Sequence, residues 1–352
     1  MIIFDAHLDL SMNAMEWNRD LRIPLEELNL REKGMTDKPD RAKATVSFPE
    51  MHKGNIALAV GTLIARYVKP GSQIPGWYSQ EQAWSQIQGQ LAWYKSMENT
   101  GHLKPILNQK DLIEHILYWE KDKSPIGYVL SLEGADSIID IEHLEKLHSQ
   151  GLRAIGLSHY GPGVHAFGTD SEGDLPQKGK ELLKKIEALG IILDVTHLSD
   201  KCFYQALDIF NGPVWASHHL CRSLSPHNRQ LSDEMIGLLL ERDAVIGMAL
   251  DAWMVVPGWV RGESTPESMG VNIDSVINHV NHIAELAGST KNIMIGSDLD
   301  GAFGTEQTPI EIKSIANLQN FIPALKKRGF TESNIEGIMW QNGVNFLKKH
   351  LK

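Results

Sequence analysis

The chain has 352 residues and a net charge of −10, with 34 Lys and Arg against 44 Asp and Glu. Its 42% hydrophobic and 22% charged residues are typical of a soluble globular protein, and the acidic balance without a basic stripe argues against a nucleic-acid partner. Two cysteines exclude a disulfide framework, and no signal-peptide pattern opens the chain. The longest apolar run (56–65) is too short to cross a bilayer. We therefore expect a cytoplasmic protein without a membrane partner.

The first ten residues contain a short apolar strand, Ile-Ile-Phe, that leads into Asp5, His7 and Asp9. Because side chains alternate faces along a strand, His7 and Asp9 point the same way and can offer two ligands to one metal ion such as zinc. An isolated His-x-Asp is more often a polar strand end than a metal site. The same pattern returns several times downstream, and this recurrence favours the metal.

The next part of the chain is irregular up to a second predicted strand at 55–65. Residues 11–53 are polar, with helical patches such as 23–30. Two helical patterns follow the second strand, at 81–97 and 109–119. Trp84 and Trp93 are interpreted as a stripe that faces the core.

From residue 127 onward, short apolar strands alternate with helical patterns. The expected strands are 2–6, 55–65, 127–132, 152–157, 191–195, 213–216, 244–250 and 292–295. The helical patterns between the later strands are 141–149, 178–189, 201–210, 233–241 and 273–287, and an amphipathic helix at 333–351 closes the chain. Eight strands with helical crossovers predict an α/β fold, a (β/α)8 TIM barrel in one domain over residues 1–352, with its active site at the C-terminal ends of the strands. A doubly wound open sheet is the alternative, but no Gly-x-Gly-x-x-Gly follows the first strand.

Most of the predicted strands end in histidine, aspartate or glutamate. Collected at one rim of a barrel, these residues are His7, Asp9, Glu133, His159, His197, His218 and Asp298. Three histidines and two carboxylates can supply two divalent ions, with one carboxylate bridging them and hydroxide held between them. Coordination lowers the pKa of water to about 7, which is what hydrolysis near neutral pH requires.

The residue pattern leaves some of these assignments open. His218 and His219 are adjacent, so only one of them can point into the barrel mouth. Asp298 and Asp300 share a face without having to share a role. Cys221 lies three residues after His218, but a single thiol without a second cysteine is weak support for a metal ligand.

Taken together, the motifs resemble those of the membrane (renal) dipeptidase family, dizinc peptidases with an amidohydrolase-like barrel. The matching segments follow the family's order from the first strand to the eighth, over most of the chain: DAHLDL (5–10), SLEGAD (131–136), GLRAIGLSH (151–159), LGIILDVTHLSD (189–200), PVWASHH (213–219), HNRQLSDE (227–234), NIDSVINHVNHIAELAG (272–288) and IGSDLDG (295–301).

The resemblance implies a specific division of the metal ligands. His7 and Asp9 would bind one zinc ion, His197 and His218 would bind the other, and Glu133 would bridge the pair. The resemblance assigns the ligand role to His218 and not to His219, because His218 follows Ser217 as the ligand of the family does.

The same matching implies roles toward a substrate. His159 would polarise the tetrahedral intermediate, Arg229 would hold the free carboxylate of the substrate, and Asp298 would receive its free α-amino group or act in proton transfer. Without the resemblance, Arg229 would be interpreted as a surface residue on a loop.

These implications predict a zinc-dependent dipeptidase with two Zn²⁺ per chain and a small dipeptide as its substrate. The alternative is another amidohydrolase reaction on the same scaffold, on N-acyl amino acids or lactones. A metal-loaded binding protein without turnover is disfavoured because no ligand or base is missing. The oligomeric state is left open, and in a homodimer the further partner would be a second copy of this chain.

The chain also departs from the family pattern. Leu8 stands where the family often has Asn, and the second strand reads Gly61-Thr62-Leu63-Ile64 in place of an aromatic Phe-Trp-Ser-like segment. The loops at 17–31 and 253–269 look individual to this protein. None of these departures touches an inferred zinc ligand, but all could line the substrate pocket, so the predicted chemistry is better supported than the substrate.

Overall fold

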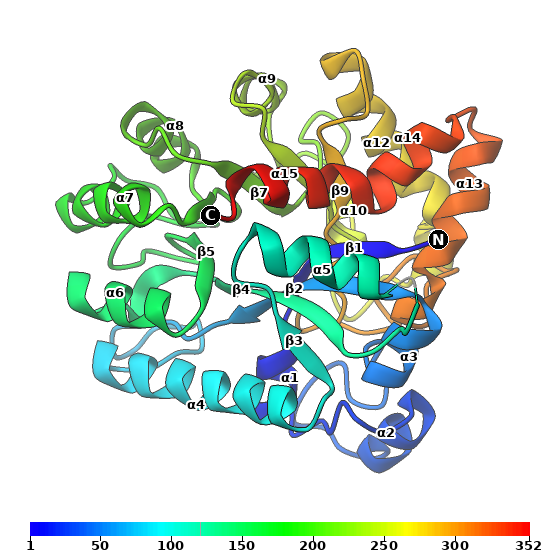
Figure 1. The fold of residues 1–352 in the computed structure, drawn as a ribbon, viewed down its shortest axis with the longest axis horizontal. Helices are drawn as coiled ribbons and strands as arrows, with labels where there is room; N and C mark the ends of the chain where they lie inside the picture. Colours follow the sequence, from blue (N-terminus) through cyan, green and yellow to red (C-terminus); the bar gives the residue numbers. More distant parts are fainter. Residues whose placement is uncertain (120) are drawn as a thin grey trace.

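The structure, a computed structural model, describes residues 1–119 and 121–352. Its centre is a barrel of eight parallel strands surrounded by helices (Figure 1). The order around the barrel is β2-β1-β9-β8-β7-β6-β5-β4, and pairing of β2 with β4 closes it. The strands are β1 (Ile3–Leu8), β2 (Ile56–Leu63), β4 (Ile126–Leu132), β5 (Leu152–Gly156), β6 (Ile192–Asp194), β7 (Val214–His219), β8 (Val245–Met248) and β9 (Ile293–Ile295). The predicted TIM barrel is confirmed, and the doubly wound sheet was wrong.

A ninth strand, β3 (Leu103–Pro105), lies outside this closed set. It pairs with the beginning of β4, from Leu103 opposite Ile126 to Pro105 opposite Tyr128. Three residues are too short to carry a strand pattern in the sequence, and the strand was not predicted.

Helices flank the strands on the outside of the barrel. They are α1 (Leu10–Met15), α2 (Leu25–Glu32), α3 (Phe48–Lys53), α4 (Gln80–Asn99), α5 (Gln109–Trp119), α6 (Ile141–Ser149), α7 (Gln177–Leu189), α8 (Asp200–Ile209), α9 (Asp233–Glu241), α10 (Ala252–Val255), α11 (Pro266–Met269), α12 (Ile273–Ala287) and α13 (Phe321–Lys327). Short 3-10 turns occupy Ala135–Ser137 and Ile315–Asn320.

Helix α12 illustrates how the sequence sets these elements. Asn272 caps its first turn by accepting a hydrogen bond from the backbone N–H of Ser275, and Gly288 ends it in a left-handed conformation at φ 63°. The residues that α12 buries recur at helical spacing and include Ile273, Val276, Ile277, Val280 and Ile283.

The core has two layers. One fills the space between the strands and the surrounding helices. The other fills the barrel interior and includes Phe4, Leu58, Val129, Trp215 and Met294. The inside of the barrel is therefore packed with apolar side chains, and most of the predicted site residues lie at or just after the strand ends at its rim.

The C-terminal segment covers one end of the barrel, across the front of Figure 1. The predicted helix over 333–351 is present but interrupted, because a π-helical turn (Gly337–Gln341) separates α14 (Glu332–Glu336) from α15 (Asn342–His350). Asn342 donates hydrogen bonds to the carbonyls of Thr290 and Ile293, at 2.8 and 2.7 Å. Gly343 packs so closely on Phe4 that a Cβ would lie 2.2 Å from the ring. This end of the barrel is therefore sealed.

None of the helices in the described ranges combines the length and apolarity needed to traverse a bilayer.

Candidate metal and substrate site

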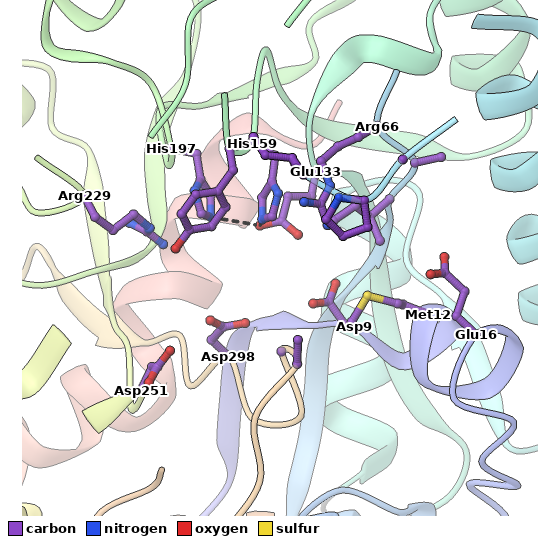
Figure 2. A pocket seen from close by; sticks show the side chains of 18 of the residues that line it. Asp9, Met12, Glu16, Arg66, Glu133, His159, His197, Arg229, Asp251 and Asp298 are labelled. Carbon is purple, nitrogen blue, oxygen red and sulfur yellow. Dashed lines mark ion pairs between the residues drawn. The ribbon is translucent and has the colours of Figure 1, made fainter. Parts of the chain in front are cut away.

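A cavity of about 660 Å³ opens at the C-terminal rim of the barrel, opposite the sealed end (Figure 2). Of the eight site residues predicted from the sequence, seven line it: Asp9, Glu133, His159, His197, His218, Arg229 and Asp298. The eighth, His7, is 2% exposed and reaches the same group from β1. The structure thus brings together all the predicted site residues.

Glu133, directly after β4, lies at the centre of the histidines. Its Oε1 is 3.6 Å from Nε2 of His7, 3.7 Å from Nε2 of His159, 3.3 Å from Nε2 of His197 and 3.4 Å from Nε2 of His218. Burial alone would raise the pKa of Glu133, but the surrounding imidazoles, His7 foremost, hold it well below its usual value. Glu133 is therefore a carboxylate shared by four imidazoles.

Hydrogen bonds fix the orientation of two of these imidazoles. Nδ1 of His197 lies 3.0 Å from the hydroxyl of Thr169, and Nδ1 of His218 lies 2.9 Å from the hydroxyl of Ser217. Their Nε2 atoms face inward and are 3.3 Å apart. Burial lowers the pKa of both histidines well below its usual value, so each presents a neutral nitrogen to the site, the form that binds metal ions.

His7 and two aspartates form the other side of the group. Nε2 of His7 lies 3.9 Å from Asp9 Oδ1 and 3.8 Å from Asp298 Oδ1, and the hydroxyl of Thr62 donates to Asp9. Burial would lower the pKa of His7, but Glu133 and the two aspartates raise it to about 10. Burial and the neighbouring Glu133 raise the pKa of Asp9 to about 6. This excess of negative charge favours a cation at Nε2 of His7.

The donor set fits divalent metal ions. Nε2 of His7 is buried and has no hydrogen-bond partner among the described residues. Three groups of ligand atoms lie within 4.8 Å of one another: His7, Glu133 and His218; Glu133, His159 and His197; and His7, Asp9 and Asp298. His197 and His218 fall into different groups, so proximity alone does not divide the ligands between two ions.

The two adjacent histidines of β7 point in different directions. His218 faces Glu133, whereas Nδ1 of His219 lies 3.2 Å from Nη1 of Arg229. Cys221 is buried away from the cavity, where its thiol donates to the carbonyl of His279. Neither His219 nor Cys221 is among the cavity-lining residues or the candidate metal groups.

Arg229 is a buried cation that reaches the cavity from the loop after β7. It is 2% exposed, and its Nη2 donates to the carbonyl of His218 at 2.9 Å. Arg222 holds this loop through two 2.7 Å ion-pair bonds to Asp200 and through the carbonyl of Gln230. Within the part of the chain that the structure describes, no carboxylate lies within 4 Å of the Arg229 guanidinium, so the site has an unneutralised positive charge at this end.

Six further charged residues line the cavity and were not predicted as site residues: Glu16, Lys38, Arg66, Asp170, Asp251 and Arg261. Two of them, Arg66 and Asp251, follow strands at the rim of the barrel. Trp253 Nε1 and Gln307 Nε2 each donate to Asp251 at 2.6 Å, and burial raises its pKa to about 6. Asp251 follows a strand, so the strand-end pattern could have identified it. Arg66 lies three residues beyond β2. Because a guanidinium does not bind metal ions, the pattern of metal ligands does not identify it.

The profile of one protein family, described as "Membrane dipeptidase (Peptidase family M19)", matches residues 1–350. Dipeptidase tcpJ of Claviceps purpurea is 24% identical over 268 residues, which cover 70% of this chain and 60% of that protein. Dipeptidase verJ of Clonostachys rogersoniana is 26% identical over 238 residues, 65% of this chain and 56% of that protein. The chain therefore matches less than two thirds of the length of either relative.

Solved structures share the fold over the full chain. Dipeptidase AC, a metallopeptidase of family M19, superposes with a TM-score of 0.80 at 20% identity and covers 100% of this chain and 99% of its own. A metallopeptidase from Rhodobacter sphaeroides, solved with a phosphinate mimic of the dipeptide L-Ala-D-Ala, has a TM-score of 0.78 at 19% identity and covers 99% of both chains.

Proposed function

The chain belongs to the membrane dipeptidase family, and from this we infer that it is a metal-dependent dipeptidase, which hydrolyses the amide bond between two amino acids. The observation that carries the inference is one carboxylate, Glu133, within 3.3–3.7 Å of four imidazole nitrogens beside a buried, unneutralised Arg229. The first feature suits metal-assisted hydrolysis, and the second suits a substrate with a free carboxylate.

Two zinc ions are the proposed cofactor. His7 and Asp9 would hold one, His197 and His218 the other, and Glu133 both. The inward-facing Nε2 atoms and the carboxylates around them support this ligand set. Such ions lower the pKa of water and polarise a carbonyl oxygen, which is the chemistry that amide hydrolysis needs.

Three side chains would bind and orient the dipeptide. Arg229 would pair with its terminal carboxylate through two parallel hydrogen bonds, and Asp298 would accept its α-amino group or pass a proton to the leaving amine. Burial lowers the pKa of His159 to about 3, so this imidazole is neutral and can donate a hydrogen bond to the scissile oxygen as it gains negative charge.

The experiment compares Ala-Ala, its C-terminal amide and its N-acetyl derivative, using zinc-loaded wild type and Arg229→Ala. We expect wild type to favour the free dipeptide strongly over both derivatives, because Arg229 requires a carboxylate and Asp298 an amine. Arg229→Ala should raise KM for Ala-Ala and lose most of the discrimination against the amide.

Arg261→Met is the matched control, since Arg261 lines the same cavity but is 61% exposed and pairs with Asp251. It should keep the wild-type discrimination. Equal hydrolysis of Ala-Ala and its amide by wild type would contradict the carboxylate clamp. Faster hydrolysis of the N-acetyl derivative would favour the alternative, an N-acyl amino acid hydrolase.

A further inference from the structure

A second cation, Arg66, lines the cavity at the end away from Arg229. Figure 2 shows the two arginines on opposite sides of the site, with His197, His159 and Glu133 between them. Among the residues that the structure describes, Arg66 has no carboxylate within 4 Å and its guanidinium makes no hydrogen bond. The site therefore has an unneutralised positive charge at each end.

The backbone around Arg66 is firmly held. The N–H of Trp77 donates to the carbonyl of Arg66 at 2.8 Å, and the N–H of Val68 donates to the carbonyl of Trp77 at 2.8 Å. Gly76 permits this close approach, because a Cβ there would lie 2.9 Å from the Arg66 carbonyl oxygen. Arg66 is thus held beside the cavity by its neighbours rather than carried on a loose loop.

Asp136 ties the same segment to the barrel. Its carboxylate accepts hydrogen bonds from the N–H of Tyr67, at 3.3 Å, and of Val164, at 2.8 Å. These bonds join the segment after β2 to the segment after β5. The position of Arg66 is therefore linked to the same rim that carries Glu133 and His159.

Glu16, an acidic residue at the same end of the cavity, forms no ion pair with Arg66. Oε1 of Glu16 accepts hydrogen bonds from the side-chain amides of Gln86 and Gln90, at 3.1 and 3.4 Å. The hydrogen bonds of this carboxylate thus come from neutral amides and not from the Arg66 guanidinium. Met12 and Ile64 line the same end, so the surroundings of the Arg66 cation are partly apolar.

These features describe a subsite for a side chain with a short apolar stem and a terminal carboxylate. The direction of the substrate follows from the proposed function, on which this inference rests. If Arg229 holds the terminal carboxylate and the histidines surround the scissile bond, the first residue of the dipeptide extends toward Arg66. We propose that Arg66 binds the side-chain carboxylate of an acidic first residue, so that dipeptides beginning with Glu or Asp are the preferred substrates.

Glutamine is the informative comparison because it has the shape of glutamate without its charge. A guanidinium grips a carboxylate with two parallel charge-assisted hydrogen bonds, and an amide offers it only one acceptor oxygen. We expect wild type to hydrolyse Glu-Ala with a kcat/KM on the order of tenfold higher than Gln-Ala. The difference should lie mainly in KM, since the contact is remote from the scissile bond.

The test measures kcat and KM of wild type, Arg66→Met, Arg66→Lys and Arg261→Met on Glu-Ala, Gln-Ala, Ala-Glu and Ala-Gln. In Arg66→Met, the kcat/KM for Glu-Ala should fall close to that for Gln-Ala, so that their ratio is near one. Arg66→Lys should keep part of the preference for Glu-Ala, because lysine retains the charge but not the planar guanidinium. Arg261→Met removes one positive charge from the same cavity and should keep the wild-type ratio. The ratio of Ala-Glu to Ala-Gln should not depend on Arg66.

A wild-type ratio near one for Glu-Ala over Gln-Ala, with hydrolysis of all four dipeptides, would overturn the role of Arg66 and leave the proposed function standing. A wild-type ratio retained in Arg66→Met would do the same. Absence of hydrolysis of every dipeptide by folded, zinc-loaded wild type would instead overturn the proposed function. If Arg66→Met fails to fold, Arg66→Lys still tests the role of Arg66, because an unchanged Glu-Ala to Gln-Ala ratio in that variant would overturn it.

Discussion

His159 is the residue for which metal binding and substrate activation can be separated. It lies 3.7 Å from Glu133 and belongs to one of the candidate metal groups, yet the proposed mechanism uses it on the substrate. A donor that stabilises a developing oxyanion contributes about 2.7–4 kcal/mol, so His159→Ala should lower kcat roughly a hundredfold or more. Its zinc content, measured by elemental analysis, should stay at the wild-type level. Loss of zinc with His159→Ala would instead make His159 a ligand.

Glu133 should control the metal content of the whole site. A neutral amide cannot balance two dications as a shared carboxylate can, so Glu133→Gln should weaken binding of both ions. The measurement is the zinc-to-protein ratio after dialysis against a weak chelator. Glu16→Gln, which removes a carboxylate from the same cavity but away from the four histidines, should keep the wild-type ratio. Two ions retained by Glu133→Gln would exclude the bridging role.

At the scale of residues, the strand-end pattern located the candidate ligands but not the residues that orient them. His7, Glu133 and His218 are found because chemistry limits metal ligands to few residue types at strand ends. His219 was not predicted as a ligand, and its role is visible only in the structure, where its Nδ1 lies 3.2 Å from Nη1 of Arg229 and orients that side chain. Arg66 could not be found from the pattern, because the pattern identifies metal ligands and a guanidinium is not one.

At the scale of elements, His279 on α12 joins this helix to two neighbouring segments. It is 1% exposed; its Nδ1 accepts from the N–H of Cys221 at 3.1 Å, and its Nε2 donates to the carbonyl of Val255 at 3.0 Å. This arrangement needs the neutral imidazole. Burial lowers the pKa of His279 from 6.5 to about 4.

This geometry predicts acid sensitivity. Because the folded state binds fewer protons than the unfolded state between pH 6.5 and 4, stability is lost as the pH falls through this range. The contribution of His279 between pH 7.5 and pH 5 should be about 2 kcal/mol. His279→Gln can accept from Cys221 and donate to Val255 without titrating, so urea unfolding at the two pH values should show a correspondingly smaller loss. If wild type and His279→Gln lost the same free energy of unfolding between the two pH values, His279 would not be the cause of the acid sensitivity.

Elements were predictable where their pattern is long. Helix α12 matches its predicted range of 273–287 because apolar spacing, an Asn cap and a Gly end all agree. The three-residue β3 lacks such a pattern. The π-helical turn inside the closing helix is followed by Asn342, which bonds to Thr290 and Ile293, and these long-range contacts are not encoded in local spacing.

At the scale of the whole molecule, a buried ionic network links the irregular N-terminal excursion to the loop after β9. Arg19 pairs with Glu32 and Asp40, each at 2.9 Å, and lies 3.6 Å from Asp300. Asp300 in turn accepts from the backbone N–H groups of Thr45 and Val46. Removing one partner of such a network leaves buried charges without compensation.

Arg19→Met should therefore destabilise the protein by about 3–5 kcal/mol, as measured by urea unfolding. Arg22→Met is the matched control, because Arg22 is exposed and pairs with Asp20 at the surface. Its effect should stay within about 1 kcal/mol. Equal effects of the two variants would show that the buried network does not stabilise the fold.

The pairing of β1 with β9 has a consequence for the order of events during synthesis. His7 and Asp298 lie far apart in the sequence, yet the N–H of Asp298 donates to the carbonyl of His7 at 3.3 Å. A growing chain that has not reached β9 already carries Glu133 and the histidines but cannot close the barrel around them. The site residues of β1 and of the loop after β9 therefore come together only after residue 298 has been translated, so a shorter growing chain does not yet hold the complete cavity.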